Sequence, residues 1–213
     1  SLDVLEEVAS HCYRECLESG YTAIGEFHYL HHDEQGRPYD DPVAAARTMM
    51  RAAKAVGIRQ TLLWTVYARG GFDRPLQERQ RRFRVEDLEQ VRAAIEALQD
   101  EVIEGVVEVG IAIHSVRAVP RGWMGPIAEL CDALGLVLHA HVSEQRIEVE
   151  QCIAETGLSP VALLHREGVL SPRFTAVHAT WLSEDDIDLL QKAGATVCLC
   201  PSTEGDLGDG VPN

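Results

Sequence analysis

The feature that most constrains the fold is a junction that occurs four times: a helix pattern ends, a glycine follows, and an apolar strand pattern begins. The four copies are E-S-G-Y-T at 18–22, K-A-V-G-I at 54–58, D-A-L-G-L at 132–136 and K-A-G-A-T at 192–196. Glycine is common at this point because a helix often ends on a left-handed residue. Repeated helix–glycine–strand units indicate parallel strands joined by right-handed crossovers. We therefore expect an α/β fold with a parallel sheet.

Strand and helix patterns alternate along the whole chain. Strands are predicted at residues 21–28, 58–67, 106–114, 136–142, 174–178 and 195–200. Helices are predicted at 3–18, 41–56, 85–99, 123–134, from about 145, after Ser159-Pro160, and from the capping box of Ser183 and Asp186 to Ala193. Asp41 and Pro42 are predicted as the N-cap and first-turn proline of the second helix. No G-x-G-x-x-G follows a strand, so a (β/α)8 barrel is expected rather than a dinucleotide-binding sheet.

Polar side chains gather where the predicted strands end. In chain order, these groups are Glu26 to Tyr29, Tyr67, His114 to Arg117, His141 with Glu144, His178, and Ser202 to Glu204. Barrel enzymes keep their active sites at the carboxyl ends of the strands, so we expect a catalytic face there. The connections at 29–41 and 68–84 are much longer than the usual βα loop of about 2–6 residues. The second is rich in arginine and is either a lid, a subunit contact or a solvated surface loop.

The composition limits the class of partner. The 213 residues are 46% hydrophobic and 25% charged, which is typical of one soluble domain, and the formal net charge is −15. So acidic a chain argues against nucleic acid or an anionic membrane as partner, although a local arginine still allows a small anionic substrate. No apolar run approaches the ~20 residues of a membrane span and no signal-peptide pattern is present, so a cytoplasmic protein is expected. The six cysteines indicate thiols rather than a disulfide framework, and a metal or redox role for Cys198 and Cys200 stays open.

The stretch L-V-L-H-A-H-V-S-E-Q at 136–145 concentrates the candidate chemistry. Side chains alternate along a strand, so His139 and His141 point the same way, and Glu144 follows the strand end. An imidazole with a carboxylate three residues later suits a metal-bound water and its proton shuttle. The alternative is that both histidines are packed and hydrogen-bonded in a barrel interior.

These motifs resemble the amidohydrolase superfamily of metal-dependent hydrolases and deaminases, through H-A-H-V-S-E and the later V-H-A-T. More narrowly, E-F-H-Y-L-H-H-D, H-S-V-R-A-V, H-V-S-E-Q and C-P-S-T-E-G-D-L-G-D-G resemble the formimidoylglutamate deiminases of histidine degradation. The resemblance runs across essentially all 213 residues. It implies a metal-dependent (β/α)8 barrel that uses one zinc ion to hydrolyse N-formimidoyl-L-glutamate to N-formyl-L-glutamate and ammonia.

The resemblance also implies the roles of six residues. His141 would be a zinc ligand, and Glu144 would take a proton from the zinc-bound water and deliver it to the departing nitrogen. His178 would hydrogen-bond and orient that water or its tetrahedral adduct. The positions that contact the substrate would be Tyr67, His114 and Arg117. The planar guanidinium of Arg117 suits bidentate binding of one of the two substrate carboxylates, and the alternative for it is a surface ion pair.

The chain departs from the superfamily pattern in two places. The H-x-H pair expected after the first barrel strand and the aspartate expected after the last have no match, so the six strands would be the second to the seventh of eight. We therefore expect residues 1–213 to be a single catalytic-barrel fragment that has His141 but lacks the other zinc ligands, binds zinc weakly or not at all, and is inactive alone. Unpaired sheet edges favour association, so a homo-oligomer or an incompletely closed barrel is expected.

Two other interpretations stay open. A different deaminase of the superfamily, acting on a purine, pyrimidine or related ring, would have less use for a carboxylate-binding Arg117. A catalytically silent barrel scaffold would explain the missing ligands, but it would not need Glu144, His178 and Arg117. The sequence does not assign the native metal or the roles of four further histidines, His28, His31, His32 and His139.

Overall fold

The structure, a computed structural model, describes residues 1–212. They form two compact units. Unit 1 consists of residues 1–66 and 77–111, and unit 2 consists of residues 67–76 and the described residues from 112 onward. That residues 1–213 form a single catalytic-barrel fragment stays a prediction.

Six strands are hydrogen-bonded in chain order. They are β1 (Ala23–His28), β2 (Arg59–Val66), β3 (Val107–Ile113), β4 (Leu138–Val142), β5 (Phe174–His178) and β6 (Thr196–Cys198). The pairs β1–β2, β4–β5 and β5–β6 are parallel. Each strand lies within two residues of its predicted bounds at either end, and the predicted α/β class with a parallel sheet is confirmed.

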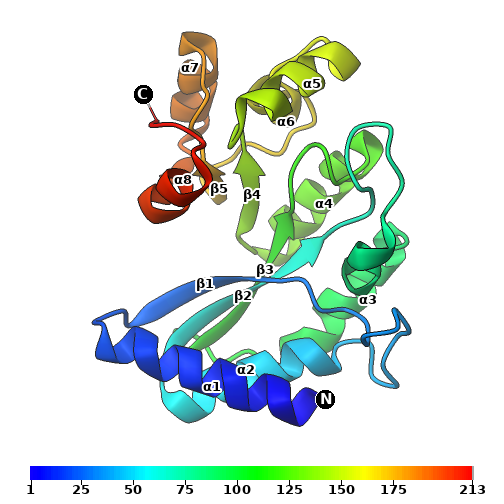
Figure 1. The fold of residues 1–213 in the computed structure, drawn as a ribbon, viewed down its shortest axis with the longest axis vertical. Helices are drawn as coiled ribbons and strands as arrows, with labels where there is room; N and C mark the ends of the chain where they lie inside the picture. The colour runs from blue at the N-terminus through cyan, green and yellow to red at the C-terminus, as the bar shows by residue number, and fades with distance from the viewer. Residues whose placement is uncertain (213) are drawn as a thin grey trace. The chain divides into compact units, whose positions relative to one another are not determined.

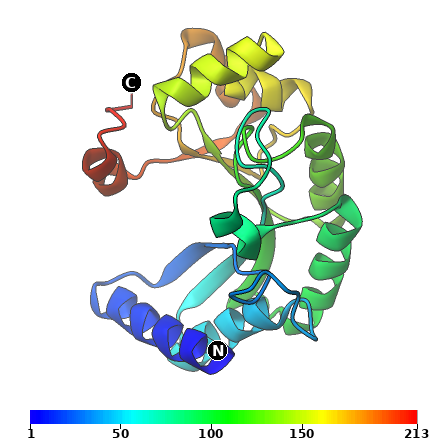
Figure 2. The same ribbon diagram turned by 45° about the vertical axis from the view of Figure 1, so that its right-hand side comes forward.

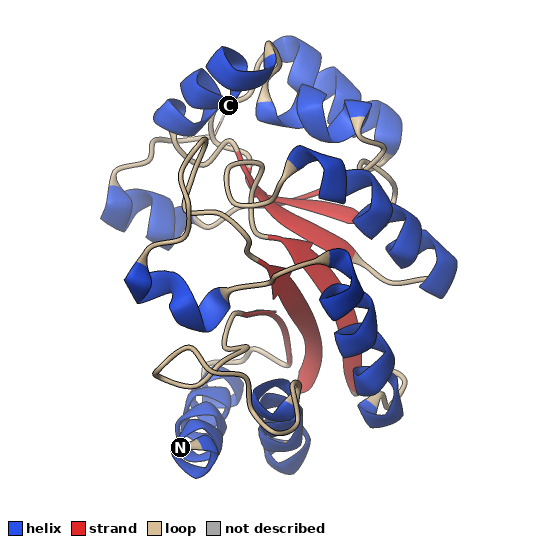
Figure 3. Cartoon of the chain, turned by 90° about the vertical axis from the view of Figure 1, so that its right-hand side faces the viewer, coloured by secondary structure: helices blue, strands red, loops and turns tan. Residues whose placement is uncertain are grey.

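Helices alternate with the strands along the chain, as the colours of Figure 3 show. The α-helices are α1 (Leu2–Glu18), α2 (Ala44–Val56), α3 (Leu88–Leu98), α4 (Arg121–Leu134), α5 (Arg146–Thr156), α6 (Pro160–Arg166), α7 (Glu184–Ala193) and α8 (Pro201–Leu207). Two short 3-10 helices, η1 (Glu78–Phe83) and η2 (Gln99–Glu101), accompany them. Among the described residues, no helix combines the length and the apolar character that crossing a membrane requires.

Local signals fixed most helix ends as predicted. Gly57, Gly135 and Gly194 take left-handed conformations and cap α2, α4 and α7. The capping box at the start of α7 is present, with Ser183 Oγ accepting from the backbone N–H of Asp186. The predicted start of α2 is wrong. The carboxylate of Asp41 accepts from the backbone N–H of residue 43 at 3.1 Å within a turn, and the helix begins only at residue 44.

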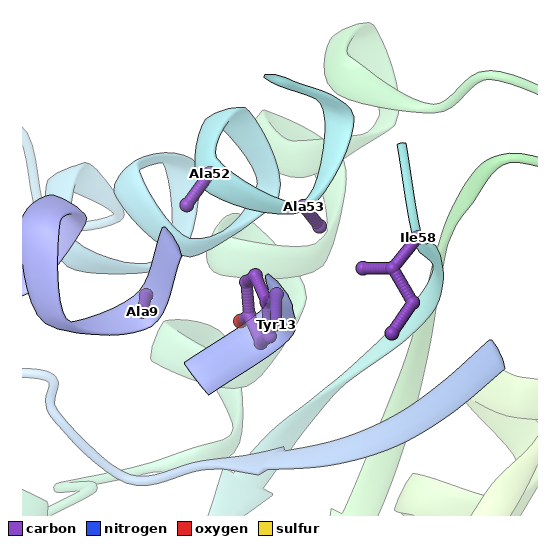
Figure 4. Close-up of a cluster of buried hydrophobic side chains, with 5 residues drawn as sticks. All are labelled: Ala9, Tyr13, Ala52, Ala53 and Ile58. Atoms are coloured by element: carbon purple, nitrogen blue, oxygen red, sulfur yellow. The ribbon is translucent and has the colours of Figure 1, made fainter. Parts of the chain in front are cut away.

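Unit 1 packs α1 and α2 side by side (Figures 1 and 2). Its core cluster, drawn in Figure 4, consists of buried side chains from α1, α2 and the entry to β2: Ala9, Tyr13, Ala52, Ala53 and Ile58. The Tyr13 hydroxyl donates to the Glu26 carboxylate, and Gln60 Nε2 donates to the same carboxylate at 2.6 Å. Burial raises the pKa of Glu26. Glu26 therefore joins α1 to the sheet, although the sequence placed it among the strand-end polar groups.

Three of the unassigned histidines pack inside unit 1. His28, His31 and His32 are each less than 5% exposed. The ring of His31 lies 3.9 Å from the ring of Trp64, and its Nε2 is 2.8 Å from the carbonyl oxygen of Thr65. Burial lowers the pKa of His28 to about 4 and that of His31 to about 3, so both rings are neutral near pH 7.

Candidate active site

The candidate site lies in unit 2 and begins at the end of β4. Along this strand the apolar side chains of Leu138, Ala140 and Val142 are buried, whereas His139 and His141 are half-buried on the other face. This is the predicted alternation. Burial lowers the pKa of His139 to about 4.

His141 is held by the neighbouring strand. Its Nδ1 lies 2.8 Å from the backbone carbonyl oxygen of His114. A carbonyl oxygen only accepts, so Nδ1 carries the hydrogen and Nε2 is the nitrogen with the lone pair. Burial lowers the pKa of His141 to about 4, and a neutral imidazole is the form that binds a metal ion. A hydrogen bond from Nδ1–H to a carbonyl is also the usual way in which proteins orient a metal-binding histidine.

Glu144 lies between a guanidinium and an imidazole. Its Oε2 is 3.5 Å from Nη2 of Arg117, and its Oε1 is 3.6 Å from Nε2 of His178. The Glu144 side chain is 13% exposed, so its carboxylate is largely shielded from water and still reachable. Such a carboxylate can accept a proton and release it again to a nearby group.

The loops after β4 and β5 are fastened to each other. Ser143, His178 and Ala179 have φ of +51°, +71° and +53°, a left-handed conformation that is uncommon for residues other than glycine. The backbone N–H of Ala179 donates to Val142 O at 3.0 Å, and that of Trp181 donates to Ser143 O at 3.0 Å. These bonds connect the segment that carries His178 to the segment that carries Glu144.

Tyr67 and His114 continue the site away from Glu144. The ring centroids of Tyr67 and His114 are 4.5 Å apart in an edge-to-face arrangement, and those of His114 and His141 are 5.0 Å apart. His114 Nδ1 lies 2.9 Å from Ser115 Oγ. Burial, together with the nearby His141 and Arg117, lowers the pKa of His114 well below its usual value, so this ring is neutral at pH 7.

A cavity of about 580 Å³ opens beside these rings. It is lined by residues of the 68–84 connection, by strand-end residues and by α5: Tyr67, Gly70, Gly71, Phe72, Asp73, Arg74, His114, Arg117, Gln151, Ala154 and Glu155. This volume suits a small molecule. All three residues predicted to contact substrate line it, and the segment 70–74 of the long basic connection forms one of its walls.

The structure thus gathers all six predicted site residues in unit 2, through a series of contacts from Tyr67 to His178. One functional candidate, Glu148, was missed. Glu148 is 1% exposed, and its Oε2 accepts from the backbone N–H of Glu144 at 3.1 Å. Burial raises the pKa of Glu148 to about 7. Glu148 lies in the first turn of α5, four residues after Glu144, and this closeness in sequence was the signal that could have found it.

Glu204 was expected among the polar groups at the strand ends, without a role of its own. It lies in α8, is 3% exposed, and its Oε1 is 3.1 Å from His178 Nδ1. Cys200, His178 and Glu204 offer ligand atoms within 4.8 Å of one another, and no other group of three such residues does so in the described part of the chain. The other candidate ligand is His141, through Nε2.

The sequence of this chain matches known proteins along its whole length. The profile of the Amidohydrolase family matches residues 1–213. Formimidoylglutamate deiminase from Pseudomonas aeruginosa is 38% identical over 219 residues, covering 99% of this chain and 46% of that protein. 5-Methylthioadenosine/S-adenosylhomocysteine deaminase from Nitratidesulfovibrio vulgaris is 35% identical over 103 residues, covering 48% of this chain and 23% of that protein. The chain therefore spans about half the length of the Pseudomonas relative.

Solved structures share the fold. An amidohydrolase from Brucella melitensis superposes with a TM-score of 0.91 at 40% identity, covering 98% of this chain and 46% of that one. An adenosine deaminase from Xanthomonas campestris with bound zinc superposes with a TM-score of 0.76 at 20% identity, covering 99% and 42%. The predicted fold class, a partial (β/α)8 barrel, is confirmed. By its sequence match over residues 1–213, the chain belongs to the Amidohydrolase family.

Proposed function

We propose that this chain is part of a zinc-dependent deiminase that hydrolyses N-formimidoyl-L-glutamate to N-formyl-L-glutamate and ammonia. The observation that carries the proposal is the position of Arg117, which lines the 580 Å³ cavity and also reaches Glu144. A binding group for a substrate carboxylate therefore lies beside a proton-transfer group. The 38% identity to the Pseudomonas deiminase supports the same substrate.

Substrate binding is assigned to the wall of the cavity. The guanidinium of Arg117 presents two parallel N–H groups, which match a carboxylate of the small anionic substrate. Tyr67 and His114 line the same cavity and offer a phenol and a neutral imidazole to the rest of the glutamate portion. An arginine at this point attracts an anion locally even though the formal net charge of the chain is −15.

The residues present fit one position of a zinc site. His141 is neutral, half-buried and oriented through Nδ1, so Nε2 would hold the metal. Zinc, when bound through His141 and ligands outside this chain, supplies Lewis acidity that activates water. A zinc site requires about four ligands, and one histidine does not provide a stable site alone.

Glu144 carries the protons. It takes a proton from the water whose oxygen adds to the formimidoyl carbon, and delivers that proton to the terminal nitrogen. The new hydroxyl group then gives up its proton through Glu144 to the same nitrogen, the carbon–nitrogen bond breaks, and ammonia leaves the formyl product. His178, whose Nε2 lies 3.6 Å from Glu144, orients the attacking water through a hydrogen bond.

A ring deaminase is the second candidate, because the Nitratidesulfovibrio relative, named for 5-methylthioadenosine and S-adenosylhomocysteine, is 35% identical over about half the chain. The same residues Glu144 and His178 would serve that chemistry. Arg117 favours N-formimidoyl-L-glutamate over 5-methylthioadenosine, which has no carboxylate for a guanidinium to bind, but S-adenosylhomocysteine carries an amino-acid carboxylate that would also suit Arg117.

The test replaces the matching segment of the Pseudomonas deiminase with residues 1–213 and measures ammonia release. N-formimidoyl-L-glutamate is the substrate, adenosine is the comparison, and circular dichroism checks that the chimera is folded. Release from N-formimidoyl-L-glutamate alone supports the proposal, whereas release from adenosine alone replaces it with the ring deaminase. If the chimera does not fold, an NMR titration of this chain with N-formimidoyl-L-glutamate decides, and unchanged Tyr67 and His114 signals would count against the proposal.

A further inference from the structure

The contacts within strand β5 do not account for the orientation of the His178 side chain. His178 is the last residue of β5, is 4% exposed, and has φ of +71°, with Ala179 following at +53°. Left-handed conformations cost about 1–2 kcal/mol for residues with a Cβ, so other contacts must hold this segment in place. The N–H of Ala179, bonded to Val142 O, fixes the backbone but leaves the imidazole able to turn about its side-chain bonds.

Glu204 fixes the imidazole. Its Oε1 lies 3.1 Å from His178 Nδ1 and also accepts the backbone N–H of Cys200 at 2.9 Å. The second bond ties the carboxylate to the first turn of its own helix, so the acceptor is rigid. A carboxylate has no hydrogen to give, which places the hydrogen of this contact on Nδ1 of His178. The other ring nitrogen, Nε2, lies 3.6 Å from Glu144 Oε1, which is too far for a hydrogen bond, so this contact requires no hydrogen on Nε2 and leaves it with the lone pair.

We propose that Glu204 is a positioning residue that holds His178 in the Nδ1–H tautomer, which leaves Nε2 as an acceptor for a water beside Glu144. The consequence for catalysis rests on the proposed function, since only there does His178 orient a water. In that reaction an Nε2 acceptor receives a hydrogen from the attacking water, whereas the opposite tautomer would present a donor. The role explains why an acidic residue stands in the S-T-E segment, which the proposed reaction steps do not use.

A metal site is the competing explanation, because the ligand atoms of His178, Cys200 and Glu204 lie within 4.8 Å. One observation disfavours it. The Glu204 carboxylate oxygen already has two N–H donors.

The test is an NMR measurement on the chain itself, and it needs no activity. Long-range proton–nitrogen correlations of the histidine rings are recorded at about pH 8 and about pH 9.5, so that a neutral ring is observed. The variant His178→Gln assigns the signal. We expect His178 as one neutral tautomer with the hydrogen on Nδ1. An Nε2–H tautomer, an equal mixture, or a ring that stays doubly protonated at both pH values would overturn the proposal.

Two variants and a control test the cause. Glu204→Gln keeps an oxygen acceptor and should preserve the tautomer, whereas Glu204→Leu should give a mixture of both. Glu167→Leu, which removes a carboxylate that pairs with Arg121 at 2.6 Å, should leave His178 unchanged. If Glu204→Leu does not fold, the wild-type tautomer and Glu204→Gln still decide. Zinc-dependent loss of the His178 signal that Cys200→Ser abolishes would establish the metal site instead and overturn the proposal.

The role proposed for Glu204 and the proposed substrate can fail independently of each other. A wild-type chain with the Nδ1–H tautomer, together with a chimera that releases ammonia only from adenosine, would keep Glu204 as a positioning residue and change only the substrate.

Discussion

The guanidinium Nη2 of Arg117 lies 3.5 Å from Oε2 of Glu144, at the edge of the cavity that Tyr67 and His114 also line. In the proposed reaction, substrate binding and proton transfer are therefore adjacent. A carboxylate bound by Arg117 would place the remainder of the molecule next to Glu144.

Replacing Arg117 by Gln in the Pseudomonas chimera should lower kcat/KM for N-formimidoyl-L-glutamate by about 10- to 100-fold. Hydrogen bonds to a charged group contribute about 1.5–3 kcal/mol, and about 1.4 kcal/mol is a factor of ten. Arg117→Lys keeps the positive charge but loses the planar guanidinium that binds a carboxylate bidentately, so it should give an intermediate kcat/KM. Arg121→Gln, which removes a guanidinium paired with Glu167, is the control. An unchanged kcat/KM for Arg117→Gln would show that the arginine does not bind the substrate.

Zinc should bind this chain weakly or not at all. Among the predicted ligands, His141 is present alone, and structural or catalytic zinc sites use three or four protein ligands. Isothermal titration calorimetry at neutral pH measures the affinity, with ammonia release from N-formimidoyl-L-glutamate as a parallel assay. Stoichiometric binding tighter than about micromolar, or turnover by the chain alone, would contradict the expectation. Should binding occur, His141→Gln and Cys200→Ser would show which group of residues holds the ion.

Glu148 should make unit 2 less stable as pH rises. Burial raises its folded pKa to about 7 from the ordinary 4.5, so the folded state holds a proton that the unfolded state has released between these values. Stability is then fully present below about pH 4.5 and falls until about pH 7, by up to ~3 kcal/mol. Glu148→Gln should remove this loss, so its free energy of unfolding relative to wild type should increase across that range in urea titrations. A pH-independent difference between the two proteins would refute the prediction.

His28 should make unit 1 less stable as pH falls. Its folded pKa of about 4 is below the ordinary 6.5, so the unfolded state binds the extra proton between these values. The stability that a neutral, buried His28 contributes is present above about pH 6.5 and is lost as pH falls toward 4, by up to ~3 kcal/mol. His28→Gln cannot gain this proton. Denaturant unfolding at about pH 7 and about pH 4.5 should therefore show a smaller acid destabilisation for the variant, and equal losses would contradict the assignment.

The chain should associate with itself. In the strand order, β1 and β6 are the outer strands, and β6 exposes Val197 and is followed by the exposed Leu199. An exposed apolar edge strand is a template for pairing with a second copy. Light scattering coupled to gel filtration should give a mass above that of one 23.5 kDa chain. Val197→Lys should reduce this mass, and a monomeric wild-type protein would exclude the prediction.

Much of the fold was predictable because its signals are local. The glycine at each helix–strand junction, the Ser183–Asp186 box and the Ser159-Pro160 start all act within one turn, and each was found where expected. Where the signal was ambiguous, the prediction failed. Asp41 caps a turn instead of α2, and the segment after Cys200, expected only as polar residues at a strand end, forms α8.

The site was less completely predictable because its supporting contacts are long-range. His141, Glu144 and His178 stand in motifs, so the sequence proposed them as candidates and the structure brings them together. Glu204 acts on a side chain 26 residues away, and no periodicity relates the two positions. The four unassigned histidines show the same limit, because a buried structural histidine such as His31 and a candidate ligand such as His141 look alike in sequence.

The two hydrogen bonds between the loops that follow β4 and β5, from Ala179 to Val142 and from Trp181 to Ser143, have a mechanical consequence. They join the backbone segments that carry Glu144 and His178, so a displacement of either segment should move both side chains together. We therefore expect substitutions of residues that line the cavity to leave the distance between Glu144 and His178 unchanged. Arg74, which lines the cavity, could then be substituted without disturbing the pair Glu144 and His178 that the proposed reaction uses.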